Sequence, residues 1–230
     1  MSDAARIIIG KGHAGYTLAR EFRKLDETTP LLLISADDGT SYYKPNLSKA
    51  LAMGKDAAAL AQFSAEQMAE TLQAQIRVNS RVEAIDPAAR TVQVNGETLP
   101  YTSLVLATGA EPIRLNLDGD AAGEVISVNN LADYAGFRER LAEGSRVLLI
   151  GAGLIGCEFA NDLAAAGHQV TAVDLAEWPL PQLLPQACGA ALQTGLEGLG
   201  VQFRLQQSVA AVKAAGTGYQ VTFSLSLIHI

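Results

Sequence analysis

Two stretches of the chain repeat one order of apolar and polar positions. Each begins with a short apolar run, passes through a glycine-rich turn into a segment with helical spacing of apolar residues, and ends in a second apolar run. Short apolar runs that alternate with helical patterns are typical of β-α-β units. Residues 6–34 and residues 145–174 therefore each predict two parallel strands joined by a helix.

The remaining patterns predict smaller elements. Residues 78–85, 91–94 and 97–101 alternate as an antiparallel meander would, with Asn95-Gly96 as its tight turn. Residues 55–75 predict a helix with no candidate catalytic or binding residues. Residues 103–107 predict a strand, and residues 131–141 predict an amphipathic helix. Turn and polar residues are concentrated at 112–118, so we expect two domains, 1–114 and 115–230.

The glycine-rich turn of the second stretch has the sequence GAGLIG. Gly151 allows a tight turn, Gly153 leaves room for a pyrophosphate to approach the backbone, and Gly156 lets helix and strand pack closely. The N-terminus of the following helix is a natural anion site. Asp174 follows Gly153 by twenty-one residues, where a carboxylate accepts hydrogen bonds from ribose hydroxyls and repels a 2′-phosphate. The pattern predicts a preference for NAD over NADP.

The first stretch carries the same spacing at Gly10, Gly12 and Gly15, with His13 and Ala14 at the helix start. His13 also fits a structural or solvent-exposed position. Ala36 occupies the place after the second strand where an acid would bind a ribose. Asp37 is the next candidate and fits a turn residue equally well. Both stretches together predict an α/β fold with two Rossmann-like nucleotide-binding units, each with a central parallel sheet.

Two further segments suggest contacts with a nucleotide. Lys44 precedes Pro45, which stiffens the loop, so a cation is presented near the first site and can stabilise a reduced, anionic ring. A solvated loop lysine is the alternative. The strand at 103–107 ends in Ala107, Thr108 and Gly109, small residues that let the backbone approach a ligand, although a plain turn has similar residues.

Composition narrows the class of protein. The chain has 230 residues, of which 49% are hydrophobic and 18% charged, as expected of a soluble globular protein. We expect a cytoplasmic location and no membrane partner, because no apolar stretch reaches about eighteen residues. The net charge of −7 argues against nucleic acid as a partner. Cys157 and Cys188 form neither a disulfide framework nor a CxxC metal motif, so no metal site is expected.

The motifs GKGHAG, YYKPNLSK, LVLATGAEP and GAGLIGCEFANDL, in this order and spacing, resemble the pyridine nucleotide-disulfide oxidoreductase family of flavoproteins, and within it the rubredoxin reductases. The resemblance implies that the first unit binds FAD and that the second, inserted in the first, binds NADH. It also implies hydride transfer from NADH to flavin and one-electron transfers to a small iron carrier protein, rubredoxin or ferredoxin.

The resemblance also implies roles for individual residues. Glu158 is placed between nicotinamide and flavin, paired with Lys49 or Lys44, and these three are the candidate catalytic residues; a helix-start acid is the plain alternative for Glu158. The candidate cofactor-binding residues are Gly10, Gly12, His13, Ala14, Gly15, Ala36, Asp37, Lys44, Pro45, Val82, Ala107, Thr108, Gly109, Gly151, Gly153, Leu154, Ile155, Gly156, Glu158 and Asp174.

The loop at residues 41–49 has no cysteine, whereas disulfide reductases of this fold need a cysteine pair beside the flavin, and the related peroxidases and oxidases need one cysteine in this loop. Cys157 fits a packing residue. Electrons are therefore expected to leave for an external acceptor. A ferredoxin reductase of an oxygenase system, the reductase part of a nitrite reductase and a redox-sensing flavoprotein that signals through conformation share these motifs. Complete relatives continue further, so we expect a truncated chain with a foreign tail near residues 224–230. Whether such a fragment is active by itself is left open.

Overall fold

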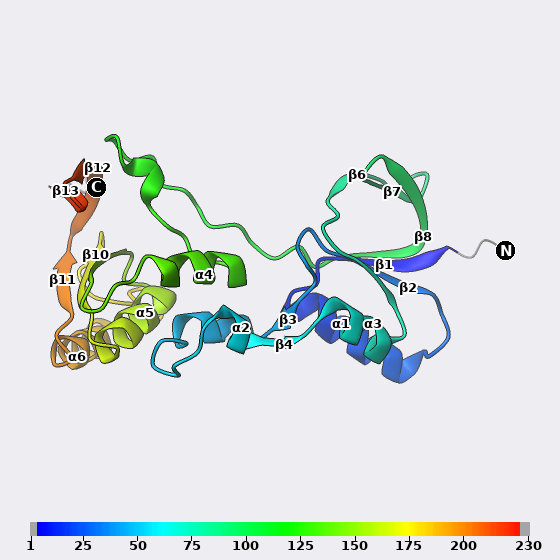
Figure 1. The fold of residues 1–230 in the computed structure, drawn as a ribbon, viewed down its shortest axis with the longest axis horizontal. Helices are drawn as coiled ribbons and strands as arrows, with labels where there is room; N and C mark the ends of the chain where they lie inside the picture. The colour runs from blue at the N-terminus through cyan, green and yellow to red at the C-terminus, as the bar shows by residue number, and fades with distance from the viewer. Residues whose placement is uncertain (1–3, 226–230) are drawn as a thin grey trace. The chain divides into compact units, whose positions relative to one another are not determined.

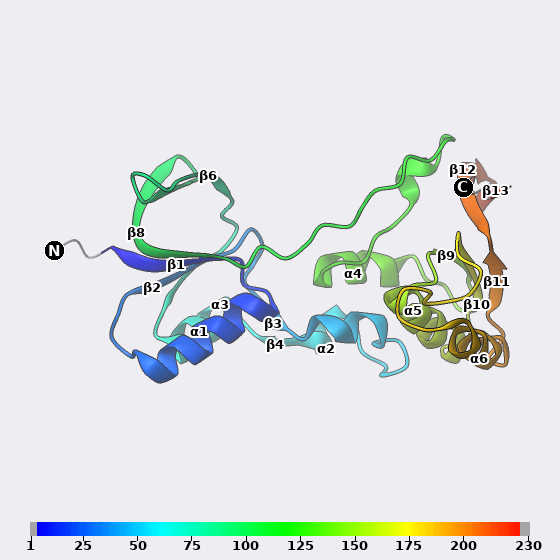
Figure 2. The ribbon, with the colours of Figure 1, turned by 180° about the vertical axis from the view of Figure 1, so that it is seen from behind.

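The computed structural model describes residues 4–225, and its contacts divide the chain into two compact units (Figures 1 and 2). The first unit comprises the residues up to Lys44 together with Ala58–Glu111. The second comprises Pro45–Ala57 together with the residues from Pro112 onward. The short segment 45–57 thus belongs to the second unit, although the chain on both sides of it belongs to the first.

The first unit is built on a six-stranded sheet. Its strands lie in the order β5 (Gln75–Arg77), β2 (Leu31–Ile34), β1 (Ala5–Ile9), β8 (Glu97–Leu106), β7 (Thr91–Val94) and β6 (Val82–Asp86). The four strands from β5 to β8 are parallel, and β7 runs antiparallel to both of its neighbours. The predicted β-α-β unit and the predicted meander are confirmed.

Alternate residues of β1 supply two separate cores, because successive side chains of a strand point to opposite faces. Ile8 packs with residues of α1 (His13–Leu25) and α3 (Ala65–Leu72), whereas Ile7 and Ile9 pack with Val92 and Val94 of the meander. Figure 1 shows the two helices on one side of β1 and β2 and the meander on the other. Both faces of the parallel strands are therefore covered, which explains their continuous apolar runs.

The helix predicted at residues 55–75 is wrong. A short helix α2 (Ala57–Leu60) leads directly into β4 (Ala61–Phe63), which pairs with β3 (Ser41–Tyr42). Ser64 then caps α3 through a capping box with Gln67. Pairing with a distant strand and a strong start signal together override the helix propensity of the alanine-rich sequence.

Other boundaries also differ from the sequence patterns. The meander starts at Val82, and β8 is one continuous strand instead of two. Residues 44–48 form a 3₁₀ helix, η1 (Lys44–Ser48). Residues 226–230 of the expected foreign tail lie outside the described residues, while 224 and 225 complete the last strand.

The second unit has a three-stranded parallel sheet in the order β11 (Gln202–Leu205), β10 (Gln169–Asp174) and β9 (Arg146–Ile150). Helix α5 (Leu154–Ala165) connects β9 to β10, and α6 (Gln186–Glu197) connects β10 to β11 (Figure 2). The remaining elements are α4 (Leu131–Glu139), the 3₁₀ turn η2 (Ala122–Glu124) and a hairpin of β12 (Gln207–Ala215) and β13 (Gly218–Leu225). The second predicted β-α-β unit is confirmed, and with it the α/β fold class.

Within residues 4–225, no helix is both long and apolar enough to span a membrane.

The glycine turn of the second unit depends on one unusual backbone angle and one close approach of backbone. Gly151 has φ +109°, which side-chain-bearing residues rarely adopt. A Cβ atom added to Gly156 would overlap the carbonyl oxygen of Gly151. Glycine at these two positions is therefore what allows α5 to start directly against the end of β9.

The contrast between two helical glycines gives a stability test. We expect Gly156→Ala to lower the free energy of unfolding by about 1–3 kcal/mol, because the new methyl group is forced into a carbonyl. Gly136→Ala in α4 is the control, since its Cβ meets no atom within 4 Å. It should raise stability by about 0.5–1 kcal/mol, the usual gain of alanine over glycine in a helix. Urea unfolding followed by circular dichroism measures both, and equal effects of the two substitutions would refute the assigned contact.

Candidate functional site

Both glycine turns end at a helix N-terminus that no side chain caps. Gly12 is the N-cap of α1 and Gly153 the N-cap of α5, and neither helix has an acid in its first turn. The backbone N–H groups of a helix's first turn have no intrahelical partner and carry partial positive charge. A Cβ atom at Gly12 or Gly153 would meet nothing within 4 Å. Both sites thus offer open, positively polarised backbone that fits a pyrophosphate.

Around the first turn, the backbone is tightly packed at Gly10 and Gly15 and open at Gly12. The Cβ positions of Gly10 and Gly15 are blocked by the carbonyls of Ala107 and Gly10, respectively, and Ala107 N donates to Ile9 O at 2.7 Å. The side chains next to this turn are solvent-exposed. They belong to His13, Ala14 and Thr108, and the adjacent Gly109 is exposed as well.

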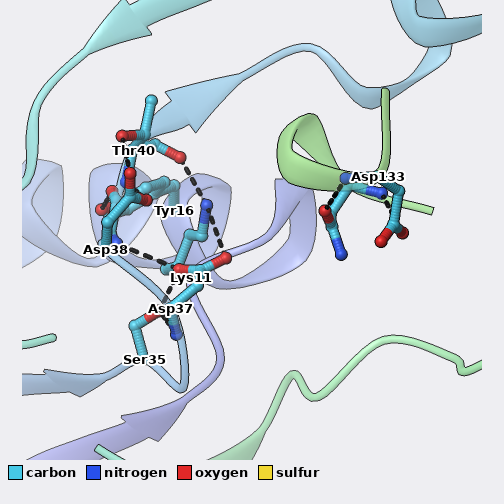
Figure 3. Close-up of polar contacts among 9 residues, drawn as sticks. Lys11, Tyr16, Ser35, Asp37, Asp38, Thr40 and Asp133 are labelled. Carbon is cyan, nitrogen blue, oxygen red and sulfur yellow. Dashed lines mark hydrogen bonds and ion pairs between the residues drawn. The ribbon is translucent and has the colours of Figure 1, made fainter. Parts of the chain in front are cut away.

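Lys11, between the first two glycines, is buried with 8% of its surface exposed. Its Nζ donates to the carbonyl of Thr40 at 2.5 Å and lies 3.2 Å from Asp37 Oδ2 (Figure 3). It also lies 4.9 Å from the centre of the Tyr42 ring. The glycine turn is therefore joined by one cation to the loop that follows β2.

Asp37 is engaged in holding that loop. Its Oδ1 accepts hydrogen bonds from Ser35 Oγ at 2.6 Å and from Gly39 N at 3.0 Å. Burial alone would raise the pKa of Asp37, but these hydrogen bonds and the charge of Lys11 outweigh burial and lower it below its usual value. Tyr16 Oη donates to the carbonyl of Gly39 at 2.5 Å, and burial, with the nearby Asp37 and Asp38, raises the pKa of Tyr16 to about 12.

A pocket of about 200 Å³ opens beside this network. It is lined by three basic side chains, Lys11, His13 and Arg20, and by the aromatic rings of Tyr16, Tyr42 and Tyr43 among others. Basic groups together with aromatic rings suit an anionic or aromatic ligand.

The other residues predicted for the first site are less directly involved. Ala36 is exposed and follows Ser35 at the end of β2. Val82 is half-buried against the meander core, so its side chain already has a packing role. Lys44 and Pro45 are exposed at the start of η1.

In the second site, Asp174 fixes the glycine turn. Its Oδ2 accepts from Ala152 N at 2.6 Å, and its Oδ1 accepts from Ala176 N at 2.8 Å. The two carboxylate oxygens are thus oriented by backbone on both sides, and each keeps a further lone pair for a ligand. Leu154 and Ile155, in the first turn of α5, are 54% and 63% exposed and add an apolar surface beside the free N–H groups.

Glu158 lies in the second turn of α5 and contacts segment 45–57. Its Oε1 is 3.4 Å from Lys49 Nζ, and its Oε2 accepts a short hydrogen bond from Ser48 Oγ. Lys49 therefore forms an ion pair with Glu158 within the second unit, whereas Lys44 belongs to the first unit and stays a prediction as a partner. The Glu158 side chain keeps 28% of its surface exposed, so solvent or a ligand still reaches it.

Cys157, the residue before Glu158, is buried. Its Sγ donates to the carbonyl of Ala152 at 3.4 Å, and burial, followed by the charge of Asp174, raises the pKa of the thiol. A buried thiol with a raised pKa is a poor nucleophile. The structure thus gives Cys157 a packing role.

Three residues at these sites escaped the sequence patterns: Lys11, Ser48 and Asp162. Lys11 stands at a variable position of the glycine turn, and Ser48 precedes Lys49 without any spacing signal. Asp162 could have been found, because it follows Glu158 by four residues and so shares its helix face.

Comparison with known proteins agrees with this geometry. A family model described as pyridine nucleotide-disulphide oxidoreductase matches residues 5–226. A rubredoxin-NAD(+) reductase of Acinetobacter baylyi is 46% identical over 96% of this chain and 58% of its own length. A similarly named protein of Alcanivorax borkumensis is 43% identical over 94% of this chain and 56% of its own length.

Among solved structures, the covalent putidaredoxin reductase–putidaredoxin complex superposes with a TM-score of 0.86 at 26% identity, covering 96% of this chain and 55% of the other. The chain thus spans a little over half the length of the curated relatives it matches. The family match covers nearly every described residue and both glycine turns. The chain belongs to the pyridine nucleotide-disulphide oxidoreductase family.

Proposed function

We propose that this chain forms the FAD- and NADH-binding part of a reductase that passes electrons from NADH through the flavin to a small iron carrier protein, most specifically rubredoxin. The observation that carries the proposal is the pair of open, uncapped helix N-termini behind Gly10–Gly15 and Gly151–Gly156. Two dinucleotide sites in one chain suit an enzyme that brings two dinucleotide cofactors together. When bound, FAD takes a hydride from NADH and releases its electrons singly to two carrier molecules.

In this proposal the first unit binds FAD. The N–H groups at the start of α1 hold the pyrophosphate, and the exposed Thr108–Gly109 segment accommodates the rest of the dinucleotide. Lys11 and Asp37 keep the loop after β2 in place beside the glycine turn. Lys44 and Pro45 stay candidates for contacts with the flavin.

The second unit binds NADH, and its residues favour NADH over NADPH. Asp174 is held at the end of β10 with its carboxylate fixed by Ala152 and Ala176. A 2′-phosphate would be repelled by this carboxylate. No lysine or arginine occurs between Asp174 and Arg204 in the sequence, and Arg204, opposite Val173 in β11, has its guanidinium over the Phe223 ring.

Glu158 and Lys49 are assigned to the reaction centre. The carboxylate of Glu158 accepts a hydrogen bond from Ser48 and is neutralised in part by Lys49. A carboxylate–ammonium pair of this kind orients a polar ligand group without leaving an unbalanced charge. We assign it to positioning the nicotinamide end of NADH.

The relatives support the proposed acceptor. Two curated relatives are named rubredoxin-NAD(+) reductases, and one structural neighbour is a reductase bound to putidaredoxin. Rubredoxin is therefore the first carrier to test and a ferredoxin the second. The cytoplasm is the proposed location, and cell fractionation tests it.

The visible absorption spectrum of the purified chain, reconstituted with FAD, tests the function directly. We expect a bound-flavin band that bleaches when NADH is added without oxygen and returns when oxidised rubredoxin is added. Ferredoxin in place of rubredoxin compares the two carriers. A band that NADH does not bleach would overturn the proposal.

Coenzyme preference tests the second site. We expect Asp174→Asn to raise the KM for NADH about tenfold, because a charged acceptor for the ribose hydroxyls is lost, and to leave the KM for NADPH unchanged or lower. Glu177→Gln removes a neighbouring acid and serves as the control, which should keep the preference. Steady-state kinetics with both coenzymes measures this, and an unaltered preference in Asp174→Asn would show that the ribose assignment is wrong.

Removal of the ammonium group tests the Lys49–Glu158 pair. We expect Lys49→Met to slow flavin reduction by saturating NADH about tenfold, which corresponds to about 1.4 kcal/mol, while FAD content stays constant. Lys55→Met, in the same segment, is the control and should reduce at the normal rate. Stopped-flow absorbance measures both. Equal rates in the two variants would remove Lys49 from the reaction centre.

A further inference from the structure

Segment 45–57 needs side-chain anchors to keep its place in the second unit. Between the 3₁₀ helix η1 and the start of α2 at Ala57 it has turns and irregular backbone, and the chain leaves the unit at both of its ends. Its buried side chains, Leu47, Ser48 and Ala50, are few and small. Hydrophobic burial alone therefore gives this segment little positional definition.

Asp162 of α5 supplies one such anchor. It is only 2% exposed, and its two carboxylate oxygens accept hydrogen bonds from two successive backbone N–H groups. The distances are 2.9 Å to Leu51 N and 2.7 Å to Ala52 N. A charged acceptor that binds backbone fixes the path of the chain regardless of which side chains the segment carries.

Glu158 lies one helical turn before Asp162 on the same face of α5. Glu158 contacts the side chains of Ser48 and Lys49. Asp162 contacts the backbone of Leu51 and Ala52, further along the same segment. The two acids thus bind neighbouring parts of one segment, residues 48–49 and residues 51–52. We call Glu158 and Asp162 the α5 carboxylates.

The far end of the segment is held by α4. Tyr134 Oη donates to the carbonyl of Lys55 at 3.0 Å, and Arg138 lies 3.5 Å from the same hydroxyl. Helix α4 itself starts with a capping box of Asn130 and Asp133, of which Figure 3 labels Asp133. The segment is therefore anchored on both sides of Ala52.

Burying the carboxylate of Asp162 carries a desolvation cost. Burial raises the pKa of Asp162, although the two backbone hydrogen bonds and the charge of Arg138 oppose this. Apolar packing at this position would avoid the desolvation. What the carboxylate adds over an apolar side chain is a fixed register between the segment and α5.

We propose that Asp162 is a positioning residue of the reaction, which holds residues 48–52 in register on α5 so that Ser48 and Lys49 meet Glu158. This inference rests on the proposed function and extends it to a residue that contacts neither cofactor. Asp162 acts through the Lys49–Glu158 pair, so its effect is on the rate of flavin reduction and not on the binding of NADH.

The test compares Asp162→Ala with Asp162→Asn in the FAD-reconstituted chain. We expect Asp162→Ala to slow flavin reduction at saturating NADH at least tenfold while the KM for NADH stays within twofold. Asp162→Asn, whose amide oxygen still accepts one hydrogen bond, should recover part of the rate. Asp120→Ala is the control, because Asp120 accepts a backbone N–H from Ala214 away from the segment. It should behave as the unmodified chain.

A double-mutant cycle decides whether Asp162 acts through Lys49. In the Lys49→Met background, Asp162→Ala should cause little further loss of rate. Independent, multiplying effects would overturn the proposal, and so would a KM that rises in parallel with the loss of rate.

Amide hydrogen exchange provides a readout that does not need the flavin reaction. The amides of Leu51 and Ala52 should be protected in the unmodified chain and should exchange at least tenfold faster in Asp162→Ala, while those of β10 stay unchanged. Unaltered exchange at Leu51 and Ala52 would refute the anchor itself. Failure of NADH to bleach the unmodified chain, with exchange behaving as expected, would instead overturn the proposed function and the catalytic part of this inference while leaving the anchor in place.

Discussion

The close contact between a glycine carbonyl and the first turn of the following helix sets the geometry of both units. Gly15 lies against Gly10 O, and Gly156 lies against Gly151 O, with no room for a Cβ atom. The strand end and the helix N-terminus are thereby brought to one point. Because the N–H groups there have no side-chain cap, the contact that allows tight packing also creates an anion site.

Acidic side chains hold the loops around these sites. Asp37, Asp174 and Asp162 each accept at least one backbone N–H, and each connects elements that are separate in the sequence or reverse the chain. Backbone donors satisfy a carboxylate without adding a second mobile side chain, so the loop gains order at a smaller entropic cost. These three carboxylates therefore hold the backbone around the two sites and the segment next to α5.

Helix α5 combines three tasks along a short length. Its first turn offers free N–H groups, its second turn carries Glu158, and its third carries Asp162. A helix is rigid, so the spacing between these groups is fixed once the helix forms. Helix α5 lies within the residues that the pyridine nucleotide-disulphide oxidoreductase family model matches, and the α5 carboxylates explain how segment 45–57 is fixed to it.

The sequence by itself determined the two β-α-β units, the meander and the glycine turns, because these depend on local spacing and on the conformations open to glycine. It also identified Asp174 and Glu158 as candidates. The tertiary structure alone decided that Asp37 and Lys11 pair and that residues 55–75 break into two helices and a strand. It also decided that Glu158 meets Ser48 and Lys49, which lie about 110 residues away. Such pairings depend on how distant segments pack, and no local spacing encodes them.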